Sequence, residues 1–290
     1  MTTESIALLG TGTMGSAFAR RLLGSRMPVR VWDVSHGAAA RLAGAGAEVA
    51  DTPEDAVRDA AVVITMVPTI ASIQDTMPRT LPAMRPGAIW LQMSTIGVEG
   101  TERAIALARE HRPDVVFVDA PVSGSKAPAE EGSLLILASG PPAALHALAP
   151  IFAVLGRKTM HWDDAGTGSR MKLVLNTWLA VLGEGIAETA ALAQSLRVSL
   201  DDVSACLSST ALNAPWALAK LDKIERYAFD PDFSLALATK DLHLALDGAA
   251  RGHQRLPLAE SIRVQWDGAL AAGLGNRDVA GAYLALATPH

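Results

Sequence analysis

The sequence predicts an α/β fold in which a doubly wound, mainly parallel sheet is followed by an all-α second domain. Short apolar runs alternate with helical patterns through the first half of the chain, which is the signature of a parallel sheet covered on both faces. After Gly168 the strand-like runs stop, and patterns rich in alanine and leucine take over. We therefore predict one domain over residues 1–165 and a helical domain over residues 166–290, joined by a long interdomain helix.

The predicted strands of the first domain are short runs of Val, Ile and Leu that end at glycine, proline or polar residues. Such runs fit strands that are buried on both faces of a sheet. Helices are predicted between them, and one begins at Thr52, where a capping threonine precedes Pro53 and two acids. Strands are predicted at 6–9, 29–32, 62–67, 88–93, 115–119, 134–138 and 159–162, and further helices at 16–23, 38–43 and 101–111.

The second domain should begin with one long helix, because no proline interrupts the chain between Gly168 and Leu196. Shorter helices are predicted at 201–208, 235–250, 258–272 and 278–286. The all-helical second domain, joined by this long and mostly apolar helix, is expected to bury more surface than one subunit can cover, so we predict a homodimer or a homotetramer. The alternative is a self-sufficient helical bundle.

Composition excludes several classes of partner. The net charge of −5 provides no basic field for nucleic acid. No stretch of about 20 residues is free of charge and glycine, and the first residues do not predict a secretory signal, so no membrane partner is expected. The seven histidines lack the spacing of metal ligands, and no metal site is predicted. Cys206, the single cysteine, is expected to be a small buried side chain and fits a reducing, cytoplasmic location.

A glycine-rich motif, G-T-G-T-M-G at residues 10–15, stands between the first predicted strand and the first helix. In this context Gly10 permits a tight turn, Gly12 lets the backbone approach a pyrophosphate, and Gly15 lets the helix pack closely on the strand. The start of the helix, including Thr13 and Met14, offers free N–H groups and a positive dipole to the phosphates. The motif predicts a Rossmann-type domain that binds a dinucleotide.

Asp33 ends the second predicted strand, near the position where such domains bind the adenine ribose. Its carboxylate should accept hydrogen bonds from the ribose hydroxyls and repel a 2′-phosphate. Val34 follows, where an NADP enzyme often places an arginine, and Arg41 is expected to lie on a solvated helix face. NAD is therefore preferred, and NADP stays open.

Two further strand ends face the same side of the predicted sheet. Val67 and Pro68 follow one strand, and Thr95 follows the next. Ligands of doubly wound sheets bind at the carboxyl ends of the strands. These residues are therefore candidate cofactor contacts.

Lys172 lies in the first turns of the long helix, where a cation opposes the helix dipole. The dipole and partial burial would favour its neutral form, which suits proton transfer near neutral pH. Asn176 lies four residues further on, on the same helix face. The alternative is a surface lysine whose head group reaches into water.

A loop after the strand at 115–119 carries Ser123 and Gly124. A serine hydroxyl and an exposed glycine N–H together can bind a substrate carboxylate. The alternative is an ordinary turn between a strand and a loop.

Taken together, four segments resemble the β-hydroxyacid dehydrogenase family, and the resemblance covers nearly the whole chain. The stretch at 120–132 is most similar to the glyoxylate/succinic semialdehyde reductase branch. The segments are G-T-G-T-M-G at 10–15, D-A-P-V-S-G-S at 119–125, G-x-G-S-R-M-K-L-V-L-N at 166–176 and F-S-L-A-L-A-T-K-D-L at 233–242.

The resemblance implies hydride transfer between a nicotinamide cofactor and a small hydroxy acid or semialdehyde. Lys172 would be the general acid/base, and Ser123 and Gly124 would hold the substrate carboxylate. Asn176 would orient the substrate, and Lys240 would contact the cofactor near the nicotinamide ribose. Asp241 is expected to cap or pair structurally.

The sequence departs from the family pattern at two places. Ser125 replaces a second glycine that many members carry, which puts the grip on the substrate in doubt. Asp33-Val34-Ser35 stands where NADPH-dependent reductases carry Asn-Arg-Thr, which favours NAD.

Two other functions remain open at this point. An imine reductase or reductive aminase shares the two-domain plan, but such enzymes mostly carry aspartate or tyrosine in place of Lys172. The apolar surroundings of that lysine, including Trp178 and the more distant Trp216, leave room for a bulkier substrate. A non-catalytic dinucleotide-binding scaffold is the alternative of another class.

Overall fold

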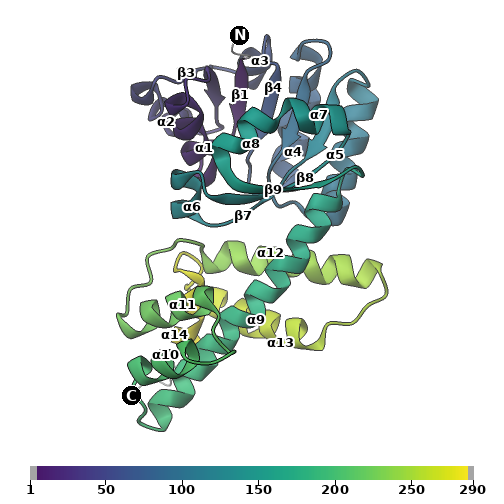
Figure 1. The fold of residues 1–290 in the computed structure, drawn as a ribbon. Helices are drawn as coiled ribbons and strands as arrows, with labels where there is room; N and C mark the ends of the chain where they lie inside the picture. The colour runs from purple at the N-terminus through teal and green to yellow at the C-terminus, as the bar shows by residue number, and fades with distance from the viewer. Residues whose placement is uncertain (1–4, 287–290) are drawn as a thin grey trace. The chain divides into compact units, whose positions relative to one another are not determined.

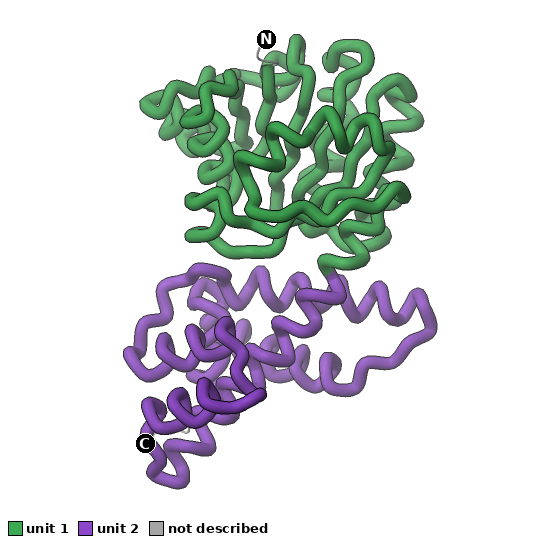
Figure 2. Tube along the Cα trace, viewed as in Figure 1, with its two compact units in different colours: residues 1–172 green, residues 173–290 purple. Residues whose placement is uncertain are grey.

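The computed structural model describes residues 5–286, and the chain forms two compact units (Figure 2). The first unit comprises residues 1–172 and the second comprises residues 173–290. The division falls inside helix α9 (Thr167–Ser195), a few residues after the predicted boundary at 165. It falls there because the first turns of α9 are hydrogen-bonded to the sheet of the first unit.

A mainly parallel sheet forms the first unit, as the sequence predicts (Figure 1). In the described residues the strand order is β3-β2-β1-β4-β5-β6-β8-β7, and β9 pairs with β8. Strands β1 to β6 are parallel to one another, and β8 is antiparallel to β6 and β7. The strands are β1 Ile6–Leu9, β2 Val29–Trp32, β3 Glu48–Val49, β4 Val62–Thr65, β5 Ile89–Gln92, β6 Val116–Asp119, β7 Val122–Ser123, β8 Leu134–Ser139 and β9 Gly156–Trp162.

Helices cover both faces of this sheet. Thr52 caps α3 by accepting a hydrogen bond from the Asp55 N–H, as predicted. The helices are α1 Thr13–Gly24, α2 His36–Ala40, η1 Ala43–Ala45, α3 Pro53–Val57, α4 Ile70–Thr80, η2 Leu81–Ala83, α5 Gly97–His111, α6 Lys126–Glu131, α7 Pro142–Ala147 and α8 Ala149–Leu155.

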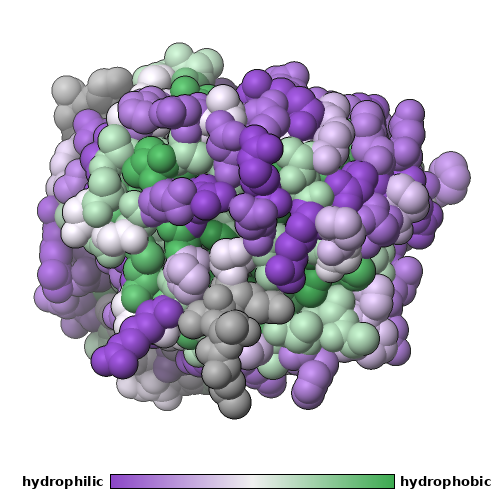
Figure 3. All heavy atoms as spheres, turned by 90° about the horizontal axis from the view of Figure 1, so that it is seen from above, coloured by the Kyte–Doolittle hydropathy of each residue, from purple (hydrophilic) through white to green (hydrophobic). Residues whose placement is uncertain are grey.

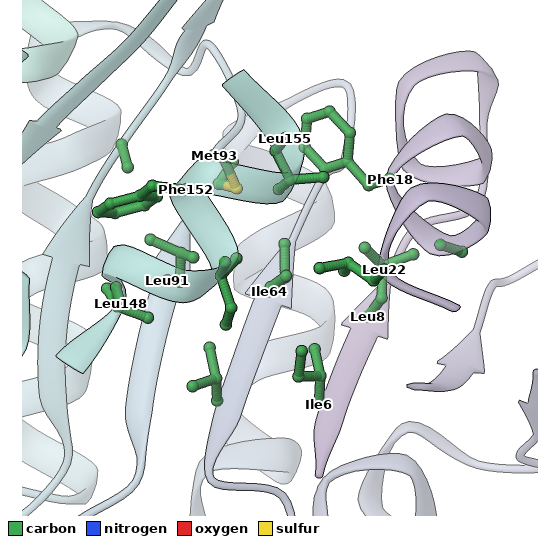
Figure 4. Close-up of a cluster of buried hydrophobic side chains, with 14 of the residues drawn as sticks. Ile6, Leu8, Phe18, Leu22, Ile64, Leu91, Met93, Leu148, Phe152 and Leu155 are labelled. Carbon is green, nitrogen blue, oxygen red and sulfur yellow. The ribbon is translucent and has the colours of Figure 1, made fainter. Parts of the chain in front are cut away.

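The core of the first unit lies in two layers, because side chains alternate along each strand. Leu8 points into a layer that Phe18 and Leu22 of α1 and Phe152 of α8 complete (Figure 4). Its neighbour Leu9 points into the opposite layer, under α3, α4 and α5. This two-sided burial explains the continuous apolar runs that predicted the strands.

The regular elements in the described part of the second unit are helices joined by loops. Two apolar clusters hold them together, and Trp266, which is fully buried, donates a hydrogen bond of 2.7 Å to Glu184 of α9. A buried ion pair of 2.9 Å joins Lys220 to Asp278. The remaining helices are α10 Leu200–Ser208, α11 Pro215–Glu225, α12 Leu235–Arg251, α13 Pro257–Ala271, η3 Val279–Ala282 and α14 Tyr283–Leu286.

The prediction for Cys206 was wrong, because its side chain is exposed. Helix α10 turns Leu200, Val203 and Leu207 toward the apolar core, and Cys206 lies on the other side.

The surface of the molecule carries hydrophilic residues with hydrophobic ones between them, as the view from above shows (Figure 3). None of the helices in residues 5–286 has the length and apolar character needed to cross a membrane.

Candidate active site

The turn between β1 and α1 needs glycine at two positions because a Cβ there would overlap with backbone atoms of the protein itself. Gly10 has a φ of +98°, and a Cβ there would lie 2.3 Å from the carbonyl oxygen of Met66. A Cβ on Gly15 would lie 2.0 Å from the carbonyl oxygen of Gly10. Beyond its own chain neighbours, no atom lies within 4 Å of a Cβ built on Gly12. Protein packing therefore does not require glycine at position 12, and the open space there suits a ligand that approaches the backbone.

The N-terminus of α1 fits an anionic group. Gly12 is its N-cap residue, no side chain caps the helix, and its first turn carries no acid. Thr13 is exposed and Met14 is half-buried at the start of this 12-residue helix. The uncapped N–H groups and the positive end of the dipole can therefore bind the pyrophosphate of a dinucleotide.

Asp33 lies beside this turn, at the end of β2. Its Oδ2 accepts a hydrogen bond of 2.6 Å from the Thr11 N–H, and its Oδ1 accepts one of 2.9 Å from the Ser35 N–H. These bonds fix the direction of the carboxylate and leave acceptor capacity for ribose hydroxyls. The next residue, Val34, is 87% exposed and uncharged, so it offers no cation to a 2′-phosphate.

The carboxyl ends of β4 and β5 bring the other predicted cofactor contacts to the same edge of the sheet. Val67 and Pro68 follow β4, and the half-buried Thr95 follows β5. The Val67 N–H donates a hydrogen bond of 2.8 Å to the hydroxyl of Ser94, the residue before Thr95. The two loops are thus joined by a residue that the sequence did not single out.

The Ser123–Gly124 segment has a fixed conformation. Ser123 ends β7, and Gly124 has a φ of +134° with the side chain of Leu134 only 2.6 Å from a Cβ built there. Ser125, the departure from the family pattern, has a φ of −103°, which any residue can adopt. The serine therefore replaces a glycine without backbone strain.

Asp119 and Ser139 attach the start of α9 to the sheet. The antiparallel register of β6 and β8 places them opposite each other. Asp119 accepts hydrogen bonds of 2.8 Å and 2.7 Å from the N–H and the hydroxyl of Ser169. The Ser139 hydroxyl accepts bonds of 3.1 Å and 3.0 Å from the N–H groups of Gly166 and Gly168. The backbone N–H groups at the N-terminus of α9 are therefore paired with side chains of two strands.

The helix also approaches the sheet very closely at Gly168. A Cβ on Gly168 would lie 2.0 Å from the carbonyl oxygen of Leu137 in β8. Lys172 follows one turn later, within the first unit, and is 8% exposed. Lys172 is therefore a buried side chain on a firmly attached helix turn, and not the surface lysine of the alternative reading.

We expect Asp119 to make the stability of the first unit depend on pH. Burial raises the pKa of Asp119 to about 6, although hydrogen bonds from Ser169 and Ser139 lower it. The folded state therefore holds the proton on Asp119 more tightly than the unfolded chain does, and this proton stabilises the folded state. The stabilisation is complete below about pH 4 and is lost as the pH rises through about 6. Asp119→Asn cannot titrate. The free energy of unfolding of the wild type relative to Asp119→Asn should fall by about 2 to 3 kcal/mol from pH 4 to pH 7.

Urea unfolding of both proteins across this pH range measures the difference. The comparison cancels the titration of the other carboxylates. A difference that stays constant across the range would contradict the raised pKa.

A second group of predicted site residues lies within the second unit. The Asn176 amide donates a hydrogen bond of 2.6 Å to Asp241 Oδ2, and the Lys240 ammonium lies 2.8 Å from Asp241 Oδ1. Asn176 and Asp241 are both buried. Asp241, which we expected to pair structurally, thus holds the side chains of two predicted site residues.

A cavity of about 210 Å³ opens at the other end of the sheet, where β1 and β2 begin. Ser5, Pro28 and Arg30 line it, and the carboxyl edge that carries the glycine turn contributes nothing to it. Among residues 5–286, no group of three or more His, Cys, Asp or Glu side chains could hold a metal ion.

Two family models match the chain. The NAD binding domain of 6-phosphogluconate dehydrogenase matches residues 5–163, and the NAD-binding domain of NADP-dependent 3-hydroxyisobutyrate dehydrogenase matches residues 166–286. With the fold, these matches define an NAD(P)-dependent oxidoreductase that acts on CH–OH groups. The chain belongs to the β-hydroxyacid dehydrogenase family.

Individual relatives agree with this family. A protein of Mycobacterium bovis named probable 3-hydroxyisobutyrate dehydrogenase is 33% identical over 88% of both chains. Glyoxylate/succinic semialdehyde reductase 1 of Arabidopsis thaliana is 30% identical over 94% of this chain and 95% of its own. The structure of Mycobacterium tuberculosis 3-hydroxyisobutyrate dehydrogenase with L-serine superposes with a TM-score of 0.89, at 30% identity, over 99% of this chain and 100% of that one. These identities do not single out the semialdehyde reductase branch.

The imine reductase alternative is less well supported. An imine reductase from Pseudomonas sp. superposes with a TM-score of 0.65 at 24% identity, over 99% of this chain and 100% of that one. This likeness extends to the fold alone. Because the relatives are NAD(P)-dependent enzymes, the alternative of a non-catalytic dinucleotide-binding scaffold is not supported.

Proposed function

We propose that the enzyme interconverts a small hydroxy acid and the corresponding semialdehyde or keto acid, with Lys172 as the general acid/base. The observation that carries this proposal is the buried Lys172, held one helix turn from the bonds that join α9 to β6 and β8. Lysine is rarely buried, because desolvation of an ammonium group is costly, so a buried lysine at this position supports a chemical role.

In this mechanism the bound nicotinamide cofactor supplies the hydride acceptor or donor. The Ser123 hydroxyl and the Gly124 N–H bind the substrate carboxylate, and Asn176, one turn beyond Lys172, orients the substrate. In oxidation Lys172 accepts the proton of the substrate hydroxyl, and in reduction it donates a proton to the carbonyl oxygen. Lys240 would contact the bound cofactor near the nicotinamide ribose, as the resemblance implies.

The names of the relatives point to short acids as substrates: 3-hydroxyisobutyrate, glyoxylate and succinic semialdehyde. A spectrophotometric screen of short β- and γ-hydroxy acids, their semialdehydes and glyoxylate, with NAD(H) and NADP(H), tests this class. A cyclic imine belongs in the same screen. Turnover of the imine alone would overturn the proposal.

We also propose that NAD is preferred over NADP, and expect Asp33→Ala to narrow that preference. The Asp33 carboxylate repels a 2′-phosphate, and the loss of its charge removes about 1 to 2 kcal/mol of discrimination. The ratio of kcat/KM with NAD to that with NADP should therefore fall about tenfold.

Steady-state kinetics with both cofactors provide the measurement. Asp51→Ala, which removes an exposed acid after β3, is the control and should leave the ratio unchanged. A wild-type enzyme that strongly prefers NADP would contradict the proposal at once.

We propose a homodimer or homotetramer that acts in the cytoplasm. The second unit exposes large apolar side chains on α9 and α13, among them Trp178 and Val264, each about 60% exposed. Such surface is usual where another subunit packs. The free, exposed Cys206 fits a reducing compartment. Light scattering coupled to gel filtration measures the oligomeric state, and a monomer at micromolar concentration would contradict it.

A further inference from the structure

A chain of buried polar side chains joins β4 to β5 at their carboxyl ends. The Trp90 indole N–H donates a hydrogen bond of 3.0 Å to the Thr65 hydroxyl, which lies 3.5 Å from Gln92 Oε1. Thr65, Gln92 and Ser94 are each at most 2% exposed. A buried polar network has an energetic cost unless its members are satisfied, so its place in the fold requires a reason.

The side chain of Gln92 takes the place of a strand partner for the backbone of Ser94. The regular pairing of β4 with β5 ends at Thr65 and Gln92. Beyond it, the Gln92 side chain accepts a hydrogen bond of 2.6 Å from the Ser94 N–H and donates one of 2.9 Å to the Ser94 carbonyl oxygen. Both backbone polar groups of Ser94 are therefore held by one amide, as a neighbouring strand would hold them.

Ser94 in turn holds the loop that follows β4. Its hydroxyl accepts the hydrogen bond of 2.8 Å from the Val67 N–H and lies 3.3 Å from the Thr65 carbonyl oxygen, to which it can donate. Gln92 thus fixes Ser94, and Ser94 fixes Val67. The separation of the two loops after β4 and β5 is set by side chains and not by strand pairing.

We infer that Gln92 and Ser94 are positioning residues for the nicotinamide half of the dinucleotide. The inference rests on the proposed function, in which Val67, Pro68 and Thr95 contact the cofactor. The glycine turn and Asp33 hold the adenosine and pyrophosphate groups, and the fixed pair of loops holds the remainder. The pair Gln92–Ser94 acts through the backbone at Val67 and Thr95.

Calorimetric binding of NADH and of ADP-ribose to Ser94→Ala tests this role. ADP-ribose carries the adenosine and pyrophosphate groups and lacks the nicotinamide. The substitution leaves the N–H of the half-buried Val67 without its acceptor, so we expect the Kd for NADH to rise about tenfold. The Kd for ADP-ribose should stay within about twofold of the wild-type value.

Thr80→Val is the matched control. Its hydroxyl is equally buried but bonds within its own helix, to the Thr76 carbonyl oxygen at 2.8 Å. It should lower stability without changing the ratio of the two Kd values. A ratio that changes equally in Thr80→Val and Ser94→Ala would show a general structural effect and would overturn the inference.

Thr95→Ala separates this inference from the proposed function. A changed ratio in Thr95→Ala with an unchanged ratio in Ser94→Ala would refute the positioning role alone. Unchanged ratios in both variants would refute the proposed place of the nicotinamide half, and the positioning role with it. A raised ratio in Ser94→Ala, with Thr80→Val unchanged, supports the inference.

Discussion

Lys172→Ala should lower kcat by at least about a hundredfold, the scale of lost general acid/base catalysis. The affinity for NAD(H) should remain nearly unchanged, because we propose that the glycine turn and Asp33 bind the dinucleotide, whereas Lys172 lies on α9. Steady-state and single-turnover kinetics on the same preparation measure the loss, and NADH fluorescence measures cofactor binding.

Two further measurements make the Lys172 result specific. Lys158→Ala, which removes an exposed lysine of β9, should retain wild-type turnover. Methylamine added to Lys172→Ala should restore part of the activity, because a free amine can take the place of the lost proton donor. Near-normal turnover of Lys172→Ala without any added amine would show that Lys172 is not the acid/base.

The second large effect concerns Gly168 in the first turn of α9. In Gly168→Ala the new methyl group would lie 2.0 Å from the Leu137 carbonyl oxygen, a backbone atom of β8 that cannot rotate away. Relief of this overlap moves the helix, so the free energy of unfolding should fall by about 3 kcal/mol or more. The displaced turn also carries Lys172, and kcat should fall at least about tenfold, because small misplacements of reacting groups are costly.

Gly185→Ala is the control for Gly168→Ala in the same helix. Gly185 is exposed, and apart from the neighbouring backbone of its own helix no atom lies within 4 Å of a Cβ built there. Alanine should therefore stabilise the protein by about 0.5 to 1 kcal/mol through helix propensity, without an effect on kcat. Denaturant unfolding of both variants gives the comparison. A Gly168→Ala protein as stable and active as Gly185→Ala would contradict the close approach of α9 to the sheet.

Local patterns predicted much of the fold because they reflect local physics. Strands buried on two faces appear as apolar runs, and the run at 29–32 coincides with β2. The capping threonine at Thr52 marked the start of α3 correctly. Helix α4 was missed because Pro78, which normally ends a helix, lies inside it. Helix α11 was missed as well, although Pro215 stands at its start.

The candidate site was predictable in part. The glycine turn, Asp33 and Lys172 stand out because each breaks a local expectation. Asp119, Ser94 and Asp241 act through partners 50, 27 and 65 residues away in the sequence, so no local pattern reveals their roles. A buried aspartate at a strand end and a serine after a strand are common, and only the packed structure shows what they hold.

A crystal structure of the enzyme with NAD and a non-reacting analogue of its substrate acid would show directly whether Lys172 is the general acid/base. We expect the Lys172 amine to lie within hydrogen-bond distance, about 3 Å, of the substrate oxygen that gains or loses the proton. A Lys172 amine directed into bulk water, remote from the nicotinamide ring, would contradict it.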